Sequence, residues 1–505
     1  MTQQRALYPL LVIATTVLAL AFAWIGWLDS DDKNHLVGAF GWYEHFPYVG
    51  ETHAALRHTI AFPVGMSFRL FGVYEWSLII PNIIQYLALV WMTFVLLRRY
   101  FDEKVATTAC LLMATLPLFP VFASVVFTEI TELFWVAMSF WLFHEAAHRD
   151  RRLWWLLGAG AAAGCGWLTR ETTAALLLAY GVLFLAGFGI ARREYWIMAI
   201  GFFVIVGAEA IYMAILTGDP LYRYQVVINK QGDIPYKGGL DGDVFNRIGN
   251  VSVNPLLDPF LVLFANHEFA LLFYVAIPAV WWSLRNSHGA QRQTLRALAL
   301  WGLIWFVFVS AILTNLHQRY YSVCAYVAAI FVAYWLVHGV SRYGRHIAGA
   351  ALAVLLAANL AALYVDNRNP LFGERALLEF SGNTQELVYT DSITARRSLF
   401  FLNIAGRSEQ VRGALPPAGV LFFVNPNRKR NWTGKNAYWN DFKPDPSWEV
   451  VWTKTEPRKW TGIILEGLEL DELLPASIYR RLNIPNHTVT VYRTNSQGAA
   501  ATAAQ

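Results

Sequence analysis

The chain has 505 residues, of which 56% are hydrophobic and only 15% are charged. Soluble domains carry about 25% charged residues, so the composition excludes an ordinary soluble globular protein and indicates a membrane protein. The formal net charge of +5 comes from Lys and Arg scattered through short loops. Because these residues form no basic stripe, the sequence argues against a nucleic-acid-binding protein.

Long apolar runs extend from the N-terminus to about residue 365. A membrane-spanning helix needs about 20 mostly apolar residues. The sequence predicts eleven such helices, at 8–28, 77–97, 104–121, 122–143, 153–169, 172–190, 195–216, 268–284, 297–314, 320–338 and 346–364. Pro117 and Pro120 interrupt the run that contains the third and fourth spans, so this division is the least distinct.

Lys and Arg gather in alternate loops of the predicted bundle. They precede the first span and follow the second, fourth, sixth, eighth and tenth, at Arg5, Arg98, Arg99, Lys104, Arg149, Arg151, Arg152, Arg192, Arg193, Arg285, Arg292, Arg296, Arg342 and Arg345. Short basic loops are typical of the cytoplasmic side. The sequence therefore predicts a cytoplasmic N-terminus and an external C-terminal region.

Three parts of the chain are predicted from these patterns. Residues 1–365 form the transmembrane domain, with a long first external loop at 29–76. Residues 366–495 read as a small external α/β domain, with strands at 386–390, 419–424 and 487–492 and a helix at 392–401. Residues 496–505 read as a disordered tail. We expect no catalytic acid in the α/β domain.

The first external loop begins with three acidic residues, Asp29, Asp31 and Asp32, directly after the first span. Acidic residues at the end of a helix are often only solvated, but three in four positions at a membrane boundary are less ordinary. Further along, residues 62–71 are apolar but too short to span. They are expected to lie along the membrane interface as an amphipathic helix.

A second acidic site, Glu129 and Glu132, lies within apolar sequence near the external end of the fourth span. Ionisable residues at membrane depth are costly, so they are usually functional or paired inside the bundle. If the role of Glu129 and Glu132 is structural, Arg170 is their expected salt-bridge partner. Arg170 and Glu171 close the next external turn. Arg319 and Tyr320 open the tenth span on the same side.

Taken in order, these residues resemble a known family. The string comprises Asp31-Asp32, the segment 58–76, Pro81, the segment 98–101, Thr128-Glu129, the segment 166–171, the segment 218–222 and Arg319-Tyr320. It is similar to the GT-C membrane glycosyltransferases of the protein-O-mannosyltransferase and aminoarabinose-transferase type, with bacterial members like the Rhizobium galacturonosyltransferases (glycosyltransferase family 39 or 83). The resemblance covers about residues 8–340.

The resemblance implies a multi-pass protein of the bacterial inner (plasma) membrane that modifies the cell envelope. Its donor would be a sugar on polyprenyl phosphate, and its acceptor a glycolipid such as lipopolysaccharide, a polysaccharide or a protein. Transfer would occur at the periplasmic face with inversion. No cofactor is implied with certainty, and a divalent metal shared by the acids is compatible with the family but not required.

The resemblance also implies roles for particular residues. Asp31 is the expected general base, which removes the proton from the acceptor hydroxyl, and Glu129 is the second catalytic acid, which orients the acceptor or tunes the base. Positive charge near the departing lipid phosphate is expected from Arg57, Arg170 or Arg319. The expected substrate-binding residues are Asp29, Asp32, Arg57, His58, Arg170, Glu171, Arg319 and Tyr320.

Two other classes of protein fit a polytopic chain. A transporter or lipid flippase would place polar residues near the bilayer midplane and often shows internal repeats, whereas here they cluster at one interface and no repeat is evident. A membrane-anchored binding or sensor protein would need only one span. We therefore prefer the glycosyltransferase interpretation.

Overall fold

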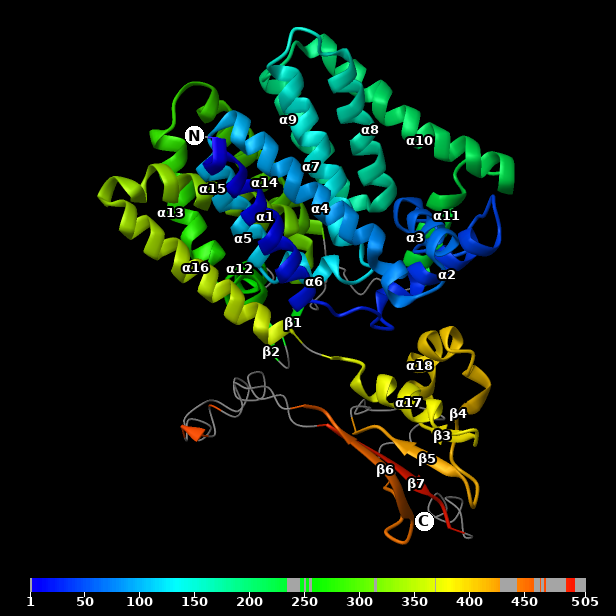
Figure 1. The fold of residues 1–505 in the computed structure, drawn as a ribbon. Coiled ribbons are helices and arrows are strands. Elements are labelled where there is room, and N and C mark those ends of the chain that lie inside the picture. Colours follow the sequence, from blue (N-terminus) through cyan, green and yellow to red (C-terminus); the bar gives the residue numbers. More distant parts are fainter. Residues whose placement is uncertain are drawn as a thin grey trace. The chain divides into compact units, whose positions relative to one another are not determined.

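The fold is described from a computed structural model of the chain (Figure 1). It describes residues 2–233, 246–248, 251–253, 257–312, 316–367, 369–426, 443–457, 464, 467–468 and 487–495, with side chains from residue 7 onward except at 228–256. The chain divides into two compact units, Met1–Asn367 and Arg368–Gln505. The predicted disordered tail, 496–505, lies outside the described residues.

The first unit is a bundle of helices with one short hairpin (Figure 1). Its elements are α1 Thr2–Phe22, α2 Asp31–Glu44, α3 His58–Phe71, α4 Glu75–Tyr100, α5 Glu103–Thr115, α6 Leu118–Ala123, α7 Thr128–Ala147, α8 Leu153–Thr169, α9 Ala174–Ala186, α10 Tyr195–Thr217, α11 Tyr222–Asp233, β1 Asn246–Ile248, β2 Val251–Val253, α12 Asp258–Ala265, α13 Leu272–Asn286, α14 Gly289–Ile312, α15 Ser322–His338 and α16 Arg345–Asp366. Two 3-10 turns, η1 Glu171–Thr173 and η4 Gln318–Tyr321, contribute to the site described below.

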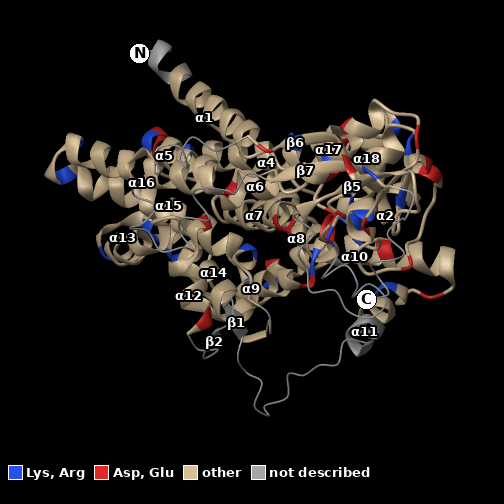
Figure 2. Ribbon diagram, turned by 90° about the horizontal axis from the view of Figure 1, so that it is seen from below, with Lys and Arg blue, Asp and Glu red and all other residues tan. Residues whose placement is uncertain are grey.

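Several of these helices are long and apolar enough to cross a membrane. By length and composition, five described segments meet this condition: Glu75–Tyr100, Arg192–Thr217, Gly289–Ile312, Gln318–Tyr343 and Arg345–Asp366. Leu7–Phe22 and Glu171–Ala186 are shorter apolar helices. The helix bodies of this unit carry few charges (Figure 2). The predicted polytopic helical bundle is confirmed, while the number of eleven crossings stays a prediction.

Several predicted spans have different boundaries in the structure, the first and the fourth among them. The first was expected to continue to residue 28, but α1 ends at Phe22. After Phe22 the Ser124 hydroxyl takes the place of backbone hydrogen-bond partners. It accepts a hydrogen bond from the Ile25 N–H at 3.2 Å and donates one to the Ala23 carbonyl at 3.1 Å. The fourth predicted span was expected at 122–143, but α7 begins only at Thr128.

The predicted long first loop contains two helices, α2 and α3, which pack closely against each other. A Cβ atom at Gly38 of α2 would lie 2.7 Å from the Ala55 Cα in the loop before α3, and one at Gly65 of α3 would lie 2.6 Å from the Trp42 Cβ of α2. Only glycine permits such an approach at these two positions. The apolar segment 62–71 forms most of α3, as a helix was expected there.

Ion pairs join the loops at the C-terminal end of α7. The Glu145 carboxylate lies 3.0 Å from Arg99 Nη1 and 2.8 Å from Arg149 Nη2, and Arg152 Nη1 lies 3.1 Å from Glu194 Oε2. The basic loops after α4, α7 and α9 therefore meet at one end of the bundle. The acidic residues Glu129 and Glu132 lie at the other end of α7, in its first two turns.

The second unit is a small α/β domain, as predicted. Its elements are α17 Phe372–Gly382, β3 Val388–Thr390, α18 Ser392–Ile404, β4 Val411–Gly413, β5 Leu421–Val424, β6 Glu449–Thr455 and β7 Thr488–Arg493. The sheet order is β4-β3-β5-β7-β6, with β3 parallel to β4 and β5 and β7 antiparallel to β5 and β6. Leu377, Val388, Phe423 and Val491 form part of its apolar core. The three strands and the helix predicted here are confirmed.

Candidate functional site

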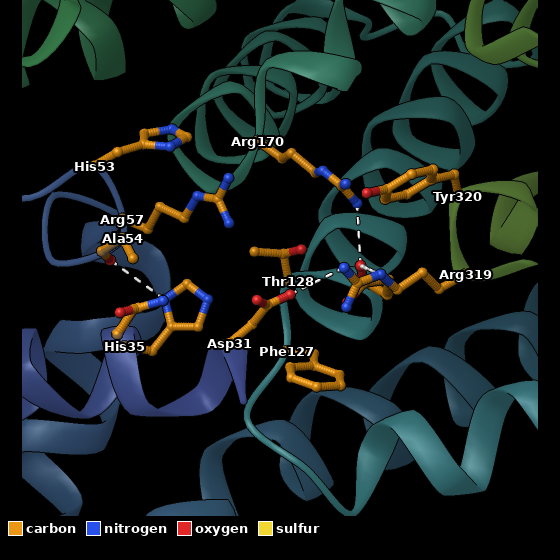
Figure 3. Close-up of a pocket in the computed structure, with 12 residues that line it drawn as sticks. Asp31, His35, His53, Ala54, Arg57, Phe127, Thr128, Arg170, Arg319 and Tyr320 are labelled. Carbon is orange, nitrogen blue, oxygen red and sulfur yellow. Dashed lines mark hydrogen bonds and ion pairs between the residues drawn. The ribbon is translucent and has the colours of Figure 1, made fainter. Parts of the chain in front are cut away.

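A polar cavity of about 180 Å³ lies where α2, the loop before α3, the start of α7, the α8–η1 turn and η4 meet (Figure 3). These segments are far apart in sequence, and each contributes polar side chains. The lining residues are Asp31, Asn34, His35, His53, Ala54, Arg57, Phe127, Thr128, Glu129, Arg170, Arg319 and Tyr320. Six of the ten predicted site residues are therefore brought together: Asp31, Arg57, Glu129, Arg170, Arg319 and Tyr320.

Asp31 stands at the first turn of α2, and 54% of its side chain is exposed. Its Oδ2 lies 2.9 Å from Arg319 Nη2 (Figure 3). The neighbouring Asp32 fixes the turn that leads into α2, because its carboxylate accepts hydrogen bonds from the Leu28 N–H at 2.7 Å and the Ser30 N–H at 2.6 Å. Asp31 is thus the one acid of this turn that reaches the cavity.

Asp29 and Asp32 do not line the cavity, and the substrate-binding role that the sequence predicted for both stays a prediction. Asp32 is fully buried, and this burial raises the pKa of its carboxyl group to about 6. Asp29 has a φ of 54°, in the left-handed region that asparagine and aspartate tolerate better than most residues. Both residues shape the turn before α2, so their positions correspond to structural roles.

Glu129 lies in the first turn of α7 and is 3% exposed. Its Oε1 lies 3.1 Å from Arg170 Nη1 and 3.4 Å from Arg319 Nε. Its Oε2 has no hydrogen-bond partner among the described residues. Glu132, one turn deeper, accepts hydrogen bonds from the Thr172 and Thr173 hydroxyls and lies 3.8 Å from Arg170 Nη1. Both acids are therefore paired within the bundle.

Two of the three cavity arginines are held by aromatic rings as well as by acids. The Arg170 guanidinium lies 4.3 Å from the centroid of the Tyr320 ring, and that of Arg319 lies 5.3 Å from the centroid of the Phe127 ring. Stacking of this kind fixes the plane of a guanidinium. Arg170 and Arg319 are thus rigid donors at the cavity wall.

Arg57 differs from the other two arginines. Within the described part of the chain it makes no ion pair, and its buried Nε has no hydrogen-bond partner. Burial, and then the charge of Arg170, lower the pKa of Arg57 to about 10, so it remains charged at neutral pH. Three guanidiniums and two carboxylates line the cavity, which leaves an excess of one positive charge. This balance favours an anionic ligand.

Two histidines line the cavity that the sequence did not assign. The His35 Nδ1 lies 3.2 Å from the Ala54 carbonyl oxygen, and burial, with the charge of Arg57, lowers the pKa of His35 to about 3. The His53 Nε2 lies 3.1 Å from Glu171 Oε1, and burial lowers the pKa of His53. A helical reading of residues 31–44 would have placed His35 on the same face as Asp31.

His58 and Glu171 lie outside the cavity lining, so their predicted substrate-binding role stays a prediction. Glu171 contacts a lining residue, since its Oε1 pairs with His53, and it also lies 3.4 Å from Arg223 Nη2. The His58 ring packs 5.7 Å from the Trp42 ring and 5.8 Å from the Tyr212 ring, and neither of its nitrogens has a hydrogen-bond partner in the described part of the chain. Burial lowers the pKa of His58 to about 4.

The sequence also missed a buried ion-pair network behind the cavity. Arg223, on α11, is 2% exposed and lies 3.0 Å from Glu209 Oε1, and it donates to the Trp167 carbonyl at 3.2 Å. Glu209 stands within an apolar span, which was the one available signal. As for metals, the residues that the structure describes contain no group of three or more His, Cys, Asp or Glu placed to hold an ion.

Part of the sequence is similar to a known family and to a curated protein. Residues 59–215 match the family described as dolichyl-phosphate-mannose-protein mannosyltransferase. The putative mannosyltransferase YkcB of Bacillus subtilis (strain 168) is 28% identical over 119 residues, which are 24% of this chain and 16% of that protein. The matched region thus spans less than a fifth of the length of this curated relative.

Solved structures are similar over a larger part of the chain. ArnT from Cupriavidus metallidurans, solved bound to undecaprenyl phosphate and in the apo state, has a TM-score of 0.56 and 13% identity, covering 97% of this chain and 98% of that one. The apo oligosaccharyltransferase of Archaeoglobus fulgidus has a TM-score of 0.50 and 12% identity, covering 80% of this chain and 64% of that one. At such identities the likeness establishes a shared fold.

Proposed function

The chain has the GT-C fold of membrane glycosyltransferases, as its sequence predicted, and from this premise we propose that it transfers a sugar from a polyprenyl-phosphate donor to an acceptor hydroxyl. The observation that carries the proposal is the cavity in which Arg57, Arg170 and Arg319 meet Asp31 and Glu129. A related structure, that of ArnT, holds undecaprenyl phosphate. Anion-binding donors and an accessible carboxylate are the two parts that such a transfer requires.

The arginines are proposed to bind the phosphate of the donor. The Arg57 Nε has no hydrogen-bond partner among the residues that the structure describes, so a phosphate oxygen can accept from it without breaking an ion pair observed there. Arginine to phosphate hydrogen bonds are charge-assisted and often bidentate. When the bond between the anomeric carbon and the phosphate oxygen breaks, these guanidiniums stabilise the charge that develops on the departing lipid phosphate.

Asp31 is proposed as the general base. The acceptor oxygen forms a bond to the anomeric carbon as the bond to phosphate breaks on the opposite side, which inverts the configuration, and the acceptor proton moves to the Asp31 carboxylate. Asp31 suits this role because it lines the cavity and is the more exposed of the two acids. The Arg319 guanidinium, 2.9 Å away, holds the carboxylate in place at the cavity wall.

Glu129 is proposed to tune the base rather than to orient the acceptor. It is buried under Arg170 and Arg319, and it shares Arg319 with Asp31. A change at Glu129 would therefore shift the position of the guanidinium that faces Asp31. The proposed substrate contacts are then Asp31, Arg57, Arg170, Arg319 and Tyr320.

We also propose the predicted orientation, with a cytoplasmic N-terminus in a bacterial inner membrane and the cavity at the periplasmic face. The ion-paired basic loops and the cavity lie at opposite ends of α7, whose 20 residues extend about 30 Å at 1.5 Å per residue. This length is similar to the hydrocarbon thickness of a bilayer, about 30 Å. The positive loops are then on the side where they are usually retained.

The proposal is tested by binding and by the products in cells. Undecaprenyl phosphate should raise the melting temperature of the purified full chain, whereas undecaprenol, which lacks the phosphate, should not. A ligand at 100 times its Kd stabilises the folded state by about 2.7 kcal/mol. A deletion strain should lose one sugar modification of the envelope and accumulate a polyprenyl-phosphate-linked sugar. Equal effects of both lipids, with unchanged envelope glycans, would contradict the proposal.

A further inference from the structure

His35 is placed to contact whatever group Asp31 deprotonates. Both residues line the cavity, and both are on α2, four residues apart. Four residues correspond to about 6 Å along a helix axis, so the two side chains share one face. In the close-up the His35 ring lies beside the Asp31 carboxylate, and its second ring nitrogen is turned away from Ala54 (Figure 3).

One hydrogen bond fixes which nitrogen of His35 carries the proton. The Ala54 carbonyl can only accept, so the Nδ1 at 3.2 Å must donate. The groups that face the ring are Arg57, His53 and Asp31, and burial together with Arg57 keeps the ring neutral by lowering its pKa to about 3. In the neutral ring the Nε2 therefore carries a lone pair and acts as an acceptor.

This acceptor differs from the charged groups of the cavity because it carries no charge, whereas the Oε2 of Glu129, unpartnered among the described residues, belongs to a buried carboxylate. The guanidiniums of Arg57, Arg170 and Arg319 only donate. Asp31 Oδ2 and Glu129 Oε1 are already ion-paired with arginines. A lone pair on neutral nitrogen repels phosphate oxygens, which are acceptors, and attracts a hydroxyl hydrogen. His35 thus marks the part of the cavity suited to an uncharged, hydroxyl-bearing group.

We propose that His35 is a substrate-binding residue whose Nε2 accepts a hydrogen bond from a sugar hydroxyl, next to the hydroxyl that Asp31 deprotonates. This inference rests on the proposed function and deepens it, because it assigns the acceptor to the class of sugars rather than polypeptides. A sugar acceptor carries neighbouring hydroxyls, so one can attack while the next is held by His35.

Two substitutions distinguish the roles of the two ring nitrogens of His35. In His35→Asn the side-chain amide is near the place of Nδ1, which keeps a donor for Ala54 and removes the Nε2 acceptor. In His35→Gln the amide reaches the place of Nε2, which restores an acceptor. His45, at the end of α2 with a side chain 72% exposed, provides the matched control substitutions His45→Asn and His45→Gln.

The full-length variants are assayed with donor-lipid and acceptor fractions isolated from a deletion strain and varied separately. His35→Asn should raise the KM for the acceptor roughly 3- to 10-fold, the range for one lost neutral hydrogen bond. It should leave the KM for the donor and the effect of undecaprenyl phosphate on the melting temperature unchanged. In His35→Gln the KM for the acceptor should return most of the way to the wild-type value. Both His45 variants should have the wild-type KM for the acceptor.

Other outcomes overturn the inference. A raised KM for the donor alone would assign the hydroxyl to the donor sugar. Unchanged kinetics in both His35 variants would show that the ring does not touch substrate, and transfer to a polypeptide would exclude the sugar class. A wild-type chain without transfer activity, whose melting temperature does not respond to undecaprenyl phosphate, would overturn the proposed function itself.

Discussion

Arg319 joins the two carboxylates of the cavity, since its Nη2 lies 2.9 Å from Asp31 Oδ2 and its Nε lies 3.4 Å from Glu129 Oε1. The two pairs differ in burial, because the Asp31 side chain is 54% exposed and that of Glu129 is 3% exposed. Exposed ion pairs contribute about 0–1 kcal/mol to stability. Substitutions at Asp31 therefore report on chemistry, whereas substitutions that unpair Glu129 also report on folding.

Asp31→Asn should lower the rate of transfer roughly 10²–10⁴-fold, the usual contribution of a general base. The amide is nearly isosteric with the carboxylate, so only basicity is lost and the melting temperature should change little. Initial rates with saturating donor measure the effect. Asp29→Asn, outside the cavity lining, is the control and should remain active. Near-wild-type transfer by Asp31→Asn would remove Asp31 as the base.

Arg57→Gln should weaken the binding of undecaprenyl phosphate roughly 10- to 100-fold, since a hydrogen bond to a charged group is worth about 1.5–3 kcal/mol. Stability should not fall, because Arg57 has no ion-paired acid among the described residues that its loss would leave alone. Titration of the melting temperature with the lipid measures both quantities. Arg69→Gln, on the exposed side of α3, is the matched control and should bind normally.

Arg170→Gln should behave differently from Arg57→Gln, although both change one cavity arginine. Arg170 lies 3.1 Å from Glu129 and 3.8 Å from Glu132, and both acids are buried. Removing one partner of a buried ion pair typically costs about 3–5 kcal/mol. The melting temperature of Arg170→Gln should therefore fall well below that of Arg57→Gln. Equal melting temperatures of the two variants would contradict the pairing described here.

The sequence predicted much of this site because alternate basic loops assign a side to each span. That reasoning alone placed Asp31, Glu129, Arg170 and Arg319 on one face, and the structure brings their side chains into one cavity. It could not separate Asp31 from its neighbours. The hydrogen bonds from Leu28 and Ser30 that make Asp32 structural depend on the fold of the turn.

Other features depended on tertiary contacts that no local pattern contains. Residues 31–44 contain Gly38 and Gly41, which disfavour a helix by propensity, yet packing against α3 makes this segment helical. His35 was missed for that reason. Arg223 was missed because its partner, Glu209, lies in another segment, within a span where the sequence showed no neighbour for it.

His58→Phe should make the protein less sensitive to acid. The folded state keeps His58 neutral with a pKa of about 4, whereas the unfolded chain binds a proton below its ordinary value of 6.5. This difference favours unfolding as the pH falls from 6.5 towards 4, by about 2 kcal/mol at pH 5. Phenylalanine cannot be protonated, and it replaces a ring whose nitrogens have no hydrogen-bond partner among the described residues.

The measurement for His58→Phe is the unfolding midpoint of wild type and variant at pH 7.5 and pH 5. At pH 7.5 the variant should be at least as stable as the wild type, because His58 Nε2 is 3.7 Å from Glu209 Oε1, too far for a hydrogen bond. At pH 5 the difference in favour of the variant should widen. If the unfolding midpoints of wild type and variant fall by the same amount between pH 7.5 and pH 5, His58 is not the group that titrates.

The orientation is the premise of every argument about the external face, and reporter fusions test it directly. A reporter fused after residue 370 follows α16, and one fused after Gly187 follows α9, at the basic end of the bundle. Alkaline phosphatase needs disulfides, which form outside the cytoplasm, so it should be active after residue 370 and inactive after Gly187. Green fluorescent protein should give the reverse pattern. Phosphatase activity only at Gly187 would invert the topology and place the cavity of Asp31 and Arg319 in the cytoplasm.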